Sequence, residues 1–214
     1  LYEQQIDEEL DTTNLNTGTS MGIHESQSRF YENIIGRSRA FWEAHFDRMK
    51  ETFKDELKDV SVDDFYQAVN CAEESYIRVE ADELTSPLHI LIRYELERMI
   101  FEENIDLEVL PELWNDKMKQ YLNIEPQKAS DGILQDVHWS AGMFGYFPTY
   151  ALGSAYAAQI YYAMLKELNL DTLVKNNEIP KINAWLKEKI HQFGASKKPR
   201  ELLKDITGED FNPN

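Results

Sequence analysis

The sequence is poor in the residue types that build disulfide-rich, turn-rich or membrane-spanning proteins. Its 214 residues include one cysteine, Cys71, which excludes an internal disulfide and is compatible with a reducing compartment. Nine glycines and seven prolines disfavour collagen-like chains, linkers and β-sandwiches. No apolar run approaches the roughly 18 residues of a membrane-spanning helix, and no signal peptide opens the chain. We therefore expect a cytoplasmic protein without a membrane partner.

Positive charge is also scarce. The chain has 22 lysines and arginines against 39 aspartates and glutamates, a net charge of −17 at pH 7. That charge repels phosphate backbones, so we expect no nucleic-acid partner. Apolar residues, in contrast, are frequent enough to form a hydrophobic core. Hydrophobic residues make up 42% of the sequence and aromatic residues 12%, which excludes a disordered protein.

Hydrophobic residues recur mainly with the period of an α-helix. Residues 41–49 place their apolar side chains on one helix face, and Ser38 is positioned to cap that helix. Ser61 and Asp64 resemble a capping box, Ser86-Pro87 favours a helix start, and Gly194 is placed like a C-cap. Further helices are expected in residues 61–72, 86–96, 113–122, 148–165 and 178–193, and after Pro199. The sequence predicts an all-α fold in one helical segment over residues 1–214.

Two segments depart from the helical pattern. Residues 75–82 alternate apolar and polar side chains, so a short strand or hairpin is possible there. Residues 131–147 hold three glycines among aromatic side chains and a histidine, which indicates irregular backbone that approaches another group closely.

The segment HESQS at residues 24–28 is one substitution away from the zinc-binding pattern H-E-x-x-H. Ser28 stands where the second histidine would be, so the segment cannot be that motif. Glu25, Arg29 and Glu32 share a helix face, and spacing alone favours an ordinary ion pair over a metal ligand.

Arg78 admits two interpretations. A guanidinium can bind a substrate carboxylate through two hydrogen bonds, but the acidic residues Glu80, Asp82 and Glu83 favour an intramolecular salt bridge.

The irregular segment also carries polar candidates. Asp136 could orient the ring of His138, although a lone histidine among aromatics is more often structural. Tyr146 and Tyr150 could donate protons or simply form an amphipathic rim. The residues by themselves indicate an acidic helical domain with a possible carboxylate-binding site.

Three segments together carry a resemblance to a known family. They read GIHESQS at 22–28, IRVEADELT at 77–85, and GILQDVHW at 132–139, followed by FGYFPTY at 144–150. In this order they resemble the HESQ, IRxxAD and GxxQDxHW signatures of the carboxypeptidase Taq family of metallocarboxypeptidases. Ser86 departs from the pattern, which has an aromatic residue there.

The resemblance implies a helical enzyme that removes single C-terminal residues from peptides. It implies one divalent metal, zinc or a cobalt substitute, held by an H-E-x-x-H helix and a downstream glutamate, which Glu25 matches. His24 and Gln27 resemble neighbours of the metal that contact substrate, and Arg78 resembles the arginine that binds the C-terminal carboxylate. It also implies that His138 and either Tyr146 or Tyr150 donate hydrogen bonds to the developing oxyanion.

No H-E-x-x-H occurs in these 214 residues. The sequence therefore resembles a C-terminal part of such an enzyme, whose partners would be its missing N-terminal portion, a peptide C-terminus and, in the parent, a second copy in a homodimer. We expect the isolated chain to be inactive and to bind zinc weakly. The alternative is a non-catalytic helical interaction or structural module.

Overall fold

The computed structural model describes residues 1–212, which contain α-helices, 3-10 turns and one π-helix but no β-strand. The prediction of an all-α fold is confirmed. The chain divides into two compact units. The first unit comprises Leu1–Val69 and the residues from Leu152 onward, and the second unit comprises Asn70–Ala151. That residues 1–214 act as one segment of a catalytic domain stays a prediction.

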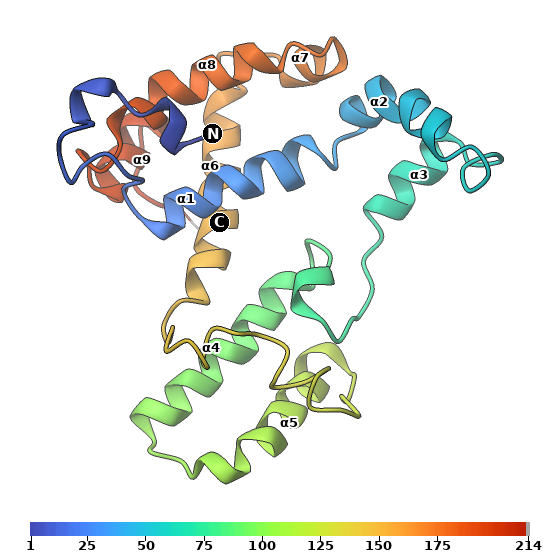
Figure 1. Ribbon diagram of the computed structural model, residues 1–214, viewed down its shortest axis with the longest axis vertical. Coiled ribbons are helices and arrows are strands. Elements are labelled where there is room, and N and C mark those ends of the chain that lie inside the picture. Colours follow the sequence, from blue (N-terminus) through green and yellow to red (C-terminus); the bar gives the residue numbers. More distant parts are fainter. Residues whose placement is uncertain (213–214) are drawn as a thin grey trace. The chain divides into compact units, whose positions relative to one another are not determined.

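The first unit begins with two 3-10 turns and then consists mainly of helices (Figure 1). Its elements before the second unit are η1 (Glu3–Gln5), η2 (Glu8–Leu10), α1 (Met21–Arg29), the π-helix η3 (Phe30–Ile35), α2 (Arg39–Thr52) and α3 (Val62–Val69). Its elements after the second unit are most of α6 (Pro148–Met164), α7 (Leu170–Lys175), α8 (Ile179–Lys189), η6 (His191–Phe193) and α9 (Pro199–Thr207).

The core of the first unit joins residues from both of its chain segments. Ile23 and Phe30 of the first segment are fully buried in one cluster with Ile160, Leu186 and Leu202 of the second. Burying a large aliphatic or aromatic side chain contributes about 1.5 to 3 kcal/mol, so this cluster fixes α1 against the C-terminal helices.

Local capping follows the sequence closely in this unit. The Ser38 Oγ accepts a hydrogen bond from the Phe41 backbone N–H at the start of α2. At the start of α3, Ser61 Oγ accepts from the Asp64 N–H while the Asp64 carboxylate accepts from the Ser61 N–H, which is a reciprocal capping box. Gly194, with φ of +47°, ends the turn η6 and not α8, because a 3-10 turn intervenes after Lys189.

The second unit is built on two long neighbouring helices, α4 (Ser86–Glu102) and α5 (Leu110–Leu122), with the turns η4 (Arg78–Glu80) and η5 (Leu107–Val109). Ile92 and Leu96 of α4 pack with Trp114 and Met118 of α5 in the core of this unit. Residues 123–147 form turns without regular helix, as the glycines among aromatic residues predicted, and α6 then begins at Pro148 as expected.

Residues 75–82, where a strand was possible, form no strand. The Gln135 side chain accepts a hydrogen bond from the Arg78 N–H and donates one to the Tyr76 carbonyl, so an amide takes the place of a partner strand. The start of α4 also differs from expectation. The N-cap is Thr85 and not Ser86, no side chain caps the helix, and the Asp82 carboxylate accepts from the Leu84 and Thr85 N–H groups just before it.

Candidate active site

The second unit buries a cluster of charged side chains around Asp136. Arg78 donates from Nε and Nη2 to Asp136 Oδ1 at 2.9 and 2.7 Å. Arg93, from the middle of α4, donates from Nε to Asp136 Oδ2 at 2.7 Å, and its Nη2 lies 2.5 Å from the same oxygen without hydrogen-bond alignment. Each carboxylate oxygen is thus held by a different arginine.

All three side chains are shielded from water. The Arg93 side chain is 0% exposed, Arg78 9% and Asp136 10%. Burial would raise the pKa of the Asp136 carboxyl, but the hydrogen bonds and charges of Arg78 and Arg93 hold it below its ordinary value. Burial lowers the pKa of Arg93 to about 10, which still leaves it protonated at neutral pH. Two cations and one anion therefore give this cluster a net charge of about +1.

Aromatic rings hold both guanidiniums in place. The Arg78 guanidinium lies 4.9 Å from the ring centre of Tyr150, and that of Arg93 lies 4.6 Å from the ring centre of Trp114. The fully buried ring of Phe147 lies near both, at 5.6 Å from Arg78 and 5.3 Å from Arg93. Such cation–π contacts contribute about 0.5 to 2 kcal/mol each and restrict the planes of the guanidiniums.

His138 lies beside this cluster. Its Nε2 is 2.9 Å from the Tyr150 hydroxyl, whereas its Nδ1 is 3.8 Å from Asp136 Oδ1, too far for a hydrogen bond. Asp136 therefore does not orient His138 directly, because its oxygens are taken by the two arginines. Burial lowers the pKa of His138, with Asp136 opposing and Arg78 adding to the effect. The ring of Tyr146 is tilted against the histidine at a centroid distance of 5.5 Å, and its hydroxyl has no hydrogen-bond partner among residues 1–212.

The loop that carries His138 is fastened to α4 by Glu97. The buried Glu97 carboxylate accepts from Trp139 Nε1 at 2.7 Å and from the Gly145 N–H at 2.9 Å. Gly145 has a φ of +75°, which a residue with a side chain adopts only with strain. This pairing explains why a glycine stands between the aromatic residues of the loop.

Glu25 lies on α1 in the first unit. Arg29 Nε donates to its Oε1 at 2.8 Å and Ser28 Oγ donates to its Oε2 at 3.0 Å, so the predicted ion pair exists. The Glu25 side chain is 20% exposed. Helix α6 comes very close here, because a Cβ on Gly153 would lie 2.5 Å from Glu25 Cγ.

The two residues flanking Glu25 face different surroundings. The half-exposed His24 lies 3.5 Å from a Glu3 carboxylate oxygen and packs against Tyr2. Gln27 is buried, and its Oε1 is 2.8 Å from His191 Nε2, while Gln5 Oε1 is 2.6 Å from the other ring nitrogen.

A metal centre needs more donors than this chain brings together. Among residues 1–212 no three histidine, cysteine, aspartate or glutamate side chains converge, so Glu25 fits the role of a single carboxylate ligand and no more.

The chain matches the carboxypeptidase Taq (M32) metallopeptidase family over residues 1–214. The chain belongs to this family. It is 54% identical over 213 residues to carboxypeptidase 1 of Bacillus subtilis, and 46% identical over 213 residues to thermostable carboxypeptidase 1 of Pyrococcus furiosus. In each case the match covers 99% of this chain and 42% of the relative, so the chain spans less than half the length of these curated relatives.

Solved structures agree with the family assignment. The M32 carboxypeptidase from Deinococcus radiodurans superimposes with a TM-score of 0.94 at 37% identity, over 100% of this chain and 43% of that one. The Pyrococcus furiosus carboxypeptidase gives a TM-score of 0.94 at 46% identity, over 99% and 43% of the two chains. None of the described helices is long and apolar enough to cross a bilayer.

In this M32 chain, sequence reasoning missed Arg93 and Glu97. Both belong to a row of buried polar residues on α4, His89, Arg93 and Glu97, spaced four apart and therefore on one helix face. Burial, followed by the charges of Arg93 and Arg78, lowers the pKa of His89 to about 4. The four-residue spacing of charged or polar side chains within an otherwise apolar helix was the available signal.

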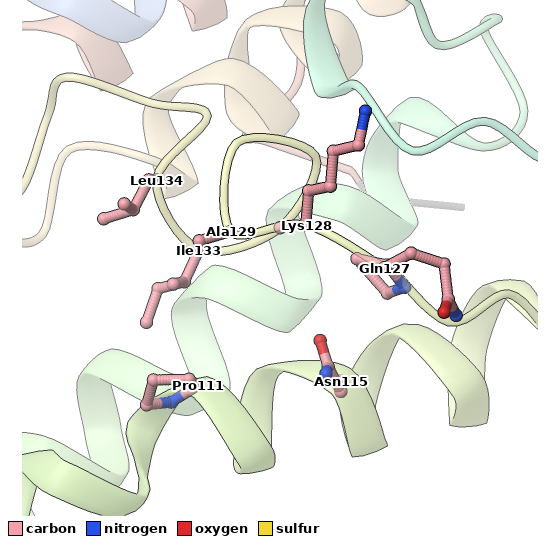
Figure 2. A pocket seen from close by; sticks show the side chains of 9 residues that line it. Pro111, Asn115, Gln127, Lys128, Ala129, Ile133 and Leu134 are labelled. Carbon is pink, nitrogen blue, oxygen red and sulfur yellow. The ribbon is translucent and has the colours of Figure 1, made fainter.

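The second unit also has a separate pocket. No charged residue of the M32 motifs lines it. It has a volume of about 290 Å³ and lies between the N-terminal half of α5 and the loop before Gln135 (Figure 2). Pro111 and Asn115 border it from α5, and Ile133 and Leu134 from the loop. Lys128 is the one ionisable residue in its lining, so it offers little acid–base chemistry.

Proposed function

We propose that this chain supplies the substrate-binding half of a metallocarboxypeptidase and one of the ligands of its metal. The observation that carries the proposal is the buried Arg78–Asp136–Arg93 cluster, which keeps a net charge of about +1 within a chain of net charge −17. A free peptide C-terminus is a carboxylate, and a shielded guanidinium is the side chain best suited to bind it. The relatives' names as carboxypeptidases support the same assignment.

Arg78 is the arginine we assign to the substrate carboxylate. Its Nε and Nη2 are bound to Asp136, while its Nη1 has no acceptor among residues 1–212. Arg93 is fully buried, and its Nη1 donates to the His89 carbonyl, so substrate has no access to its guanidinium.

The two tyrosines receive different roles. Tyr150 is engaged with His138, so we assign it to holding the imidazole. The Tyr146 hydroxyl lacks such a partner and is therefore our candidate donor to the oxyanion that forms at the scissile carbonyl. His138, as a neutral imidazole with a lowered pKa, adds a second polar group beside it.

We assign Glu25 as the carboxylate ligand of one divalent metal, with zinc as the expected ion and cobalt as a substitute. When bound, such an ion supplies an activated water and polarises the scissile carbonyl. The histidine ligands and the general base would come from the part of the relatives that this chain does not span, because the chain contains no H-E-x-x-H. We accordingly propose that the isolated chain binds zinc weakly and is inactive.

His24 and Gln27 support α1 around this ligand in our proposal. Gln27 is bound to His191 inside the first unit, so contact with substrate is better suited to the half-exposed His24. We further propose that the complete protein acts on peptide C-termini in the cytoplasm and forms a homodimer, as the family resemblance implies. A purely structural module finds no support in the family assignment.

A chimera tests this proposal. The chain is joined to the complementary part of the Bacillus subtilis relative, and release of the C-terminal residue from an N-blocked dipeptide is measured against the same dipeptide with an amidated C-terminus. We expect activity on the free acid alone. Glu25→Gln should abolish both bound zinc and activity, because an amide is a poor ligand. The control Glu32→Gln, which changes an exposed partner of Arg29 on the adjoining π-helix η3, should change neither.

Equal rates on the free and amidated dipeptides would contradict the role of Arg78. Full zinc content in the Glu25→Gln chimera would contradict the role of Glu25. Stoichiometric, submicromolar zinc binding by the isolated chain in isothermal titration would contradict the incomplete ligand set.

A further inference from the structure

Arg93 is a charged residue that reaches the candidate site without facing substrate. It projects from α4, a helix whose neighbouring positions Ile92 and Leu96 lie in the apolar core of the second unit. A fully buried guanidinium costs several kcal/mol to desolvate, and replacing it with an apolar side chain is often neutral or stabilising. Its presence therefore calls for a reason beyond stability.

The geometry around Asp136 supplies that reason. An isolated arginine and carboxylate prefer a fork in which two N–H groups bind two oxygens. Arg78 does not form this fork, since both of its donors converge on Oδ1. Oδ2 is occupied by Arg93 Nε at 2.7 Å with Nη2 at 2.5 Å. Arg93 thus blocks the arrangement that would pair Arg78 fully with Asp136.

Charge leads to the same conclusion. Without Arg93, Arg78 and Asp136 form a neutral pair, and a substrate carboxylate would meet no net positive charge. With Arg93 the cluster keeps one positive charge that Asp136 does not balance, and Arg93 itself is too deeply buried for substrate to reach. The charge is therefore available only at Arg78, the more exposed of the two guanidiniums.

From this we infer that Arg93 is a positioning residue that competes with Arg78 for Asp136 and so keeps Arg78 able to bind the carboxylate of a peptide C-terminus. Arg93 touches neither substrate nor metal in this view and acts through Asp136. The inference rests on the proposed carboxylate-binding role of Arg78 and adds the residue that sets its selectivity.

The test uses the 214-residue chain and two probes, N-acetylphenylalanine and N-acetylphenylalaninamide, which differ in the terminal carboxylate. Binding is followed by NMR titration, together with the Nε–H signals of the arginines. In wild type we expect the acid to bind at least tenfold more tightly than the amide. Arg93→Met should remove that preference and shift the Arg78 Nε–H signal as Arg78 turns to cover both oxygens.

Two further variants separate positioning from a general structural role. Arg93→Lys keeps the positive charge, so it should retain most of the preference, within about threefold of wild type. Arg98→Met changes an exposed arginine of the same helix that pairs with Glu102, and it should alter neither the preference nor the Arg78 signal. Simple loss of stability would weaken binding of both probes alike in every variant.

The outcomes distinguish the two proposals. If wild type does not prefer the acid, the carboxylate-binding role of Arg78 fails, and the Arg78 Nε–H signal alone then decides whether Arg93 positions it. If Arg93→Met leaves that signal and the acid preference unchanged, the inference is wrong. Where Arg93→Met does not fold, the same two measurements are made on Arg93→Gln, which is also uncharged but keeps a polar side chain, and an unchanged signal with an unchanged acid preference there also overturns it.

Discussion

The two units of this chain bury polar groups in opposite ways. In the first unit, His191 lies between the side-chain amides of Gln5 and Gln27, and all three groups are uncharged at neutral pH. In the second unit, Asp136 lies between the guanidiniums of Arg78 and Arg93, and all three groups are charged. Both arrangements place one central group between two partners, but only the second leaves a net charge.

The two networks differ in how they can respond to a ligand. An amide can turn end for end, so a neutral imidazole between two glutamines can donate from one nitrogen and accept on the other. Such a network joins η1, α1 and η6 through uncharged groups, so it needs no compensating charge nearby. A buried ionic network has no such freedom, because the loss of one member leaves an uncompensated charge. It is the arrangement that can act on a charged ligand.

The largest effect should come from removing the central carboxylate. Asp136→Ala leaves two buried guanidiniums facing each other without an anion, and we expect it to lower the free energy of unfolding by about 3 to 5 kcal/mol. Urea denaturation measures the change. Asp63→Ala, which removes an exposed partner of Arg39, should cost less than about 1 kcal/mol. Comparable losses in the two variants would mean that burial does not distinguish the ionic network.

Acid should weaken both units through their buried histidines. Burial lowers the pKa of His191 to about 4, and burial with the charges of Arg93 and Arg78 lowers that of His89 to about 4. Both imidazoles are then neutral in the folded protein at pH 5 but protonated in the unfolded chain. The free energy of unfolding is therefore highest above pH 6.5 and falls toward pH 4, by about 3 kcal/mol for each histidine.

Denaturant titrations at pH 7 and pH 4.5 measure this fall. His191→Gln in the first unit and His89→Gln in the second should each reduce it by removing one titrating group. A fall of the same size in wild type and in both variants would show that other groups control acid sensitivity.

The sequence predicts local features of this fold better than its buried network. The capping box at Ser61 and Asp64 is specified by residues three positions apart, and the structure has it as predicted. Sequence spacing favours a salt bridge between Arg78 and the nearby acids, but the partner of Arg78 is Asp136, 58 positions away. Sequence spacing cannot find such a partner, because only the packing of the turn η4 against the loop that carries Gln135 brings the two together.

Sequence spacing also cannot show whether two nearby residues interact, because other residues can occupy their polar atoms. Asp136 and His138 are two positions apart, which suggests an interaction, yet both oxygens of Asp136 are taken by arginines. The sequence does contain an indication for Arg93, since Arg93 lies four residues from both His89 and Glu97 in an otherwise apolar helix. The motif resemblance identified the family because it relies on several segments in order and not on single pairs.

A smaller effect is expected where two helices of the first unit touch. Gly153→Ala would place a Cβ 2.5 Å from Glu25 Cγ, 2.7 Å from its Cβ and 3.1 Å from its backbone carbon. Because backbone is among these contacts, α1 has to shift, and we expect a loss of about 1 to 3 kcal/mol that the better helix propensity of alanine partly offsets. Thermal or urea unfolding measures it.

The matched control for this glycine lies in the second unit. A Cβ on Gly132 would meet no atom closer than 3.4 Å, so Gly132→Ala should be tolerated. Equal losses at the two glycines would show that the close approach at Glu25 does not constrain the fold.

The smallest effect should come from the ion pair of the first unit, Arg29 with Glu25. The two side chains are 17% and 20% exposed, so water still reaches both, and Ser28 keeps its hydrogen bond to Glu25 when the arginine is removed. Arg29→Met should therefore cost less than about 1 kcal/mol, as pairs one helical turn apart usually do. Urea unfolding at low and high salt measures the cost, and high salt should shrink it further. A loss above about 2 kcal/mol would mean that this pair contributes as much as a buried ionic network like that of Asp136. The two units would then differ only in the number of charged groups and not in how deeply those groups are buried.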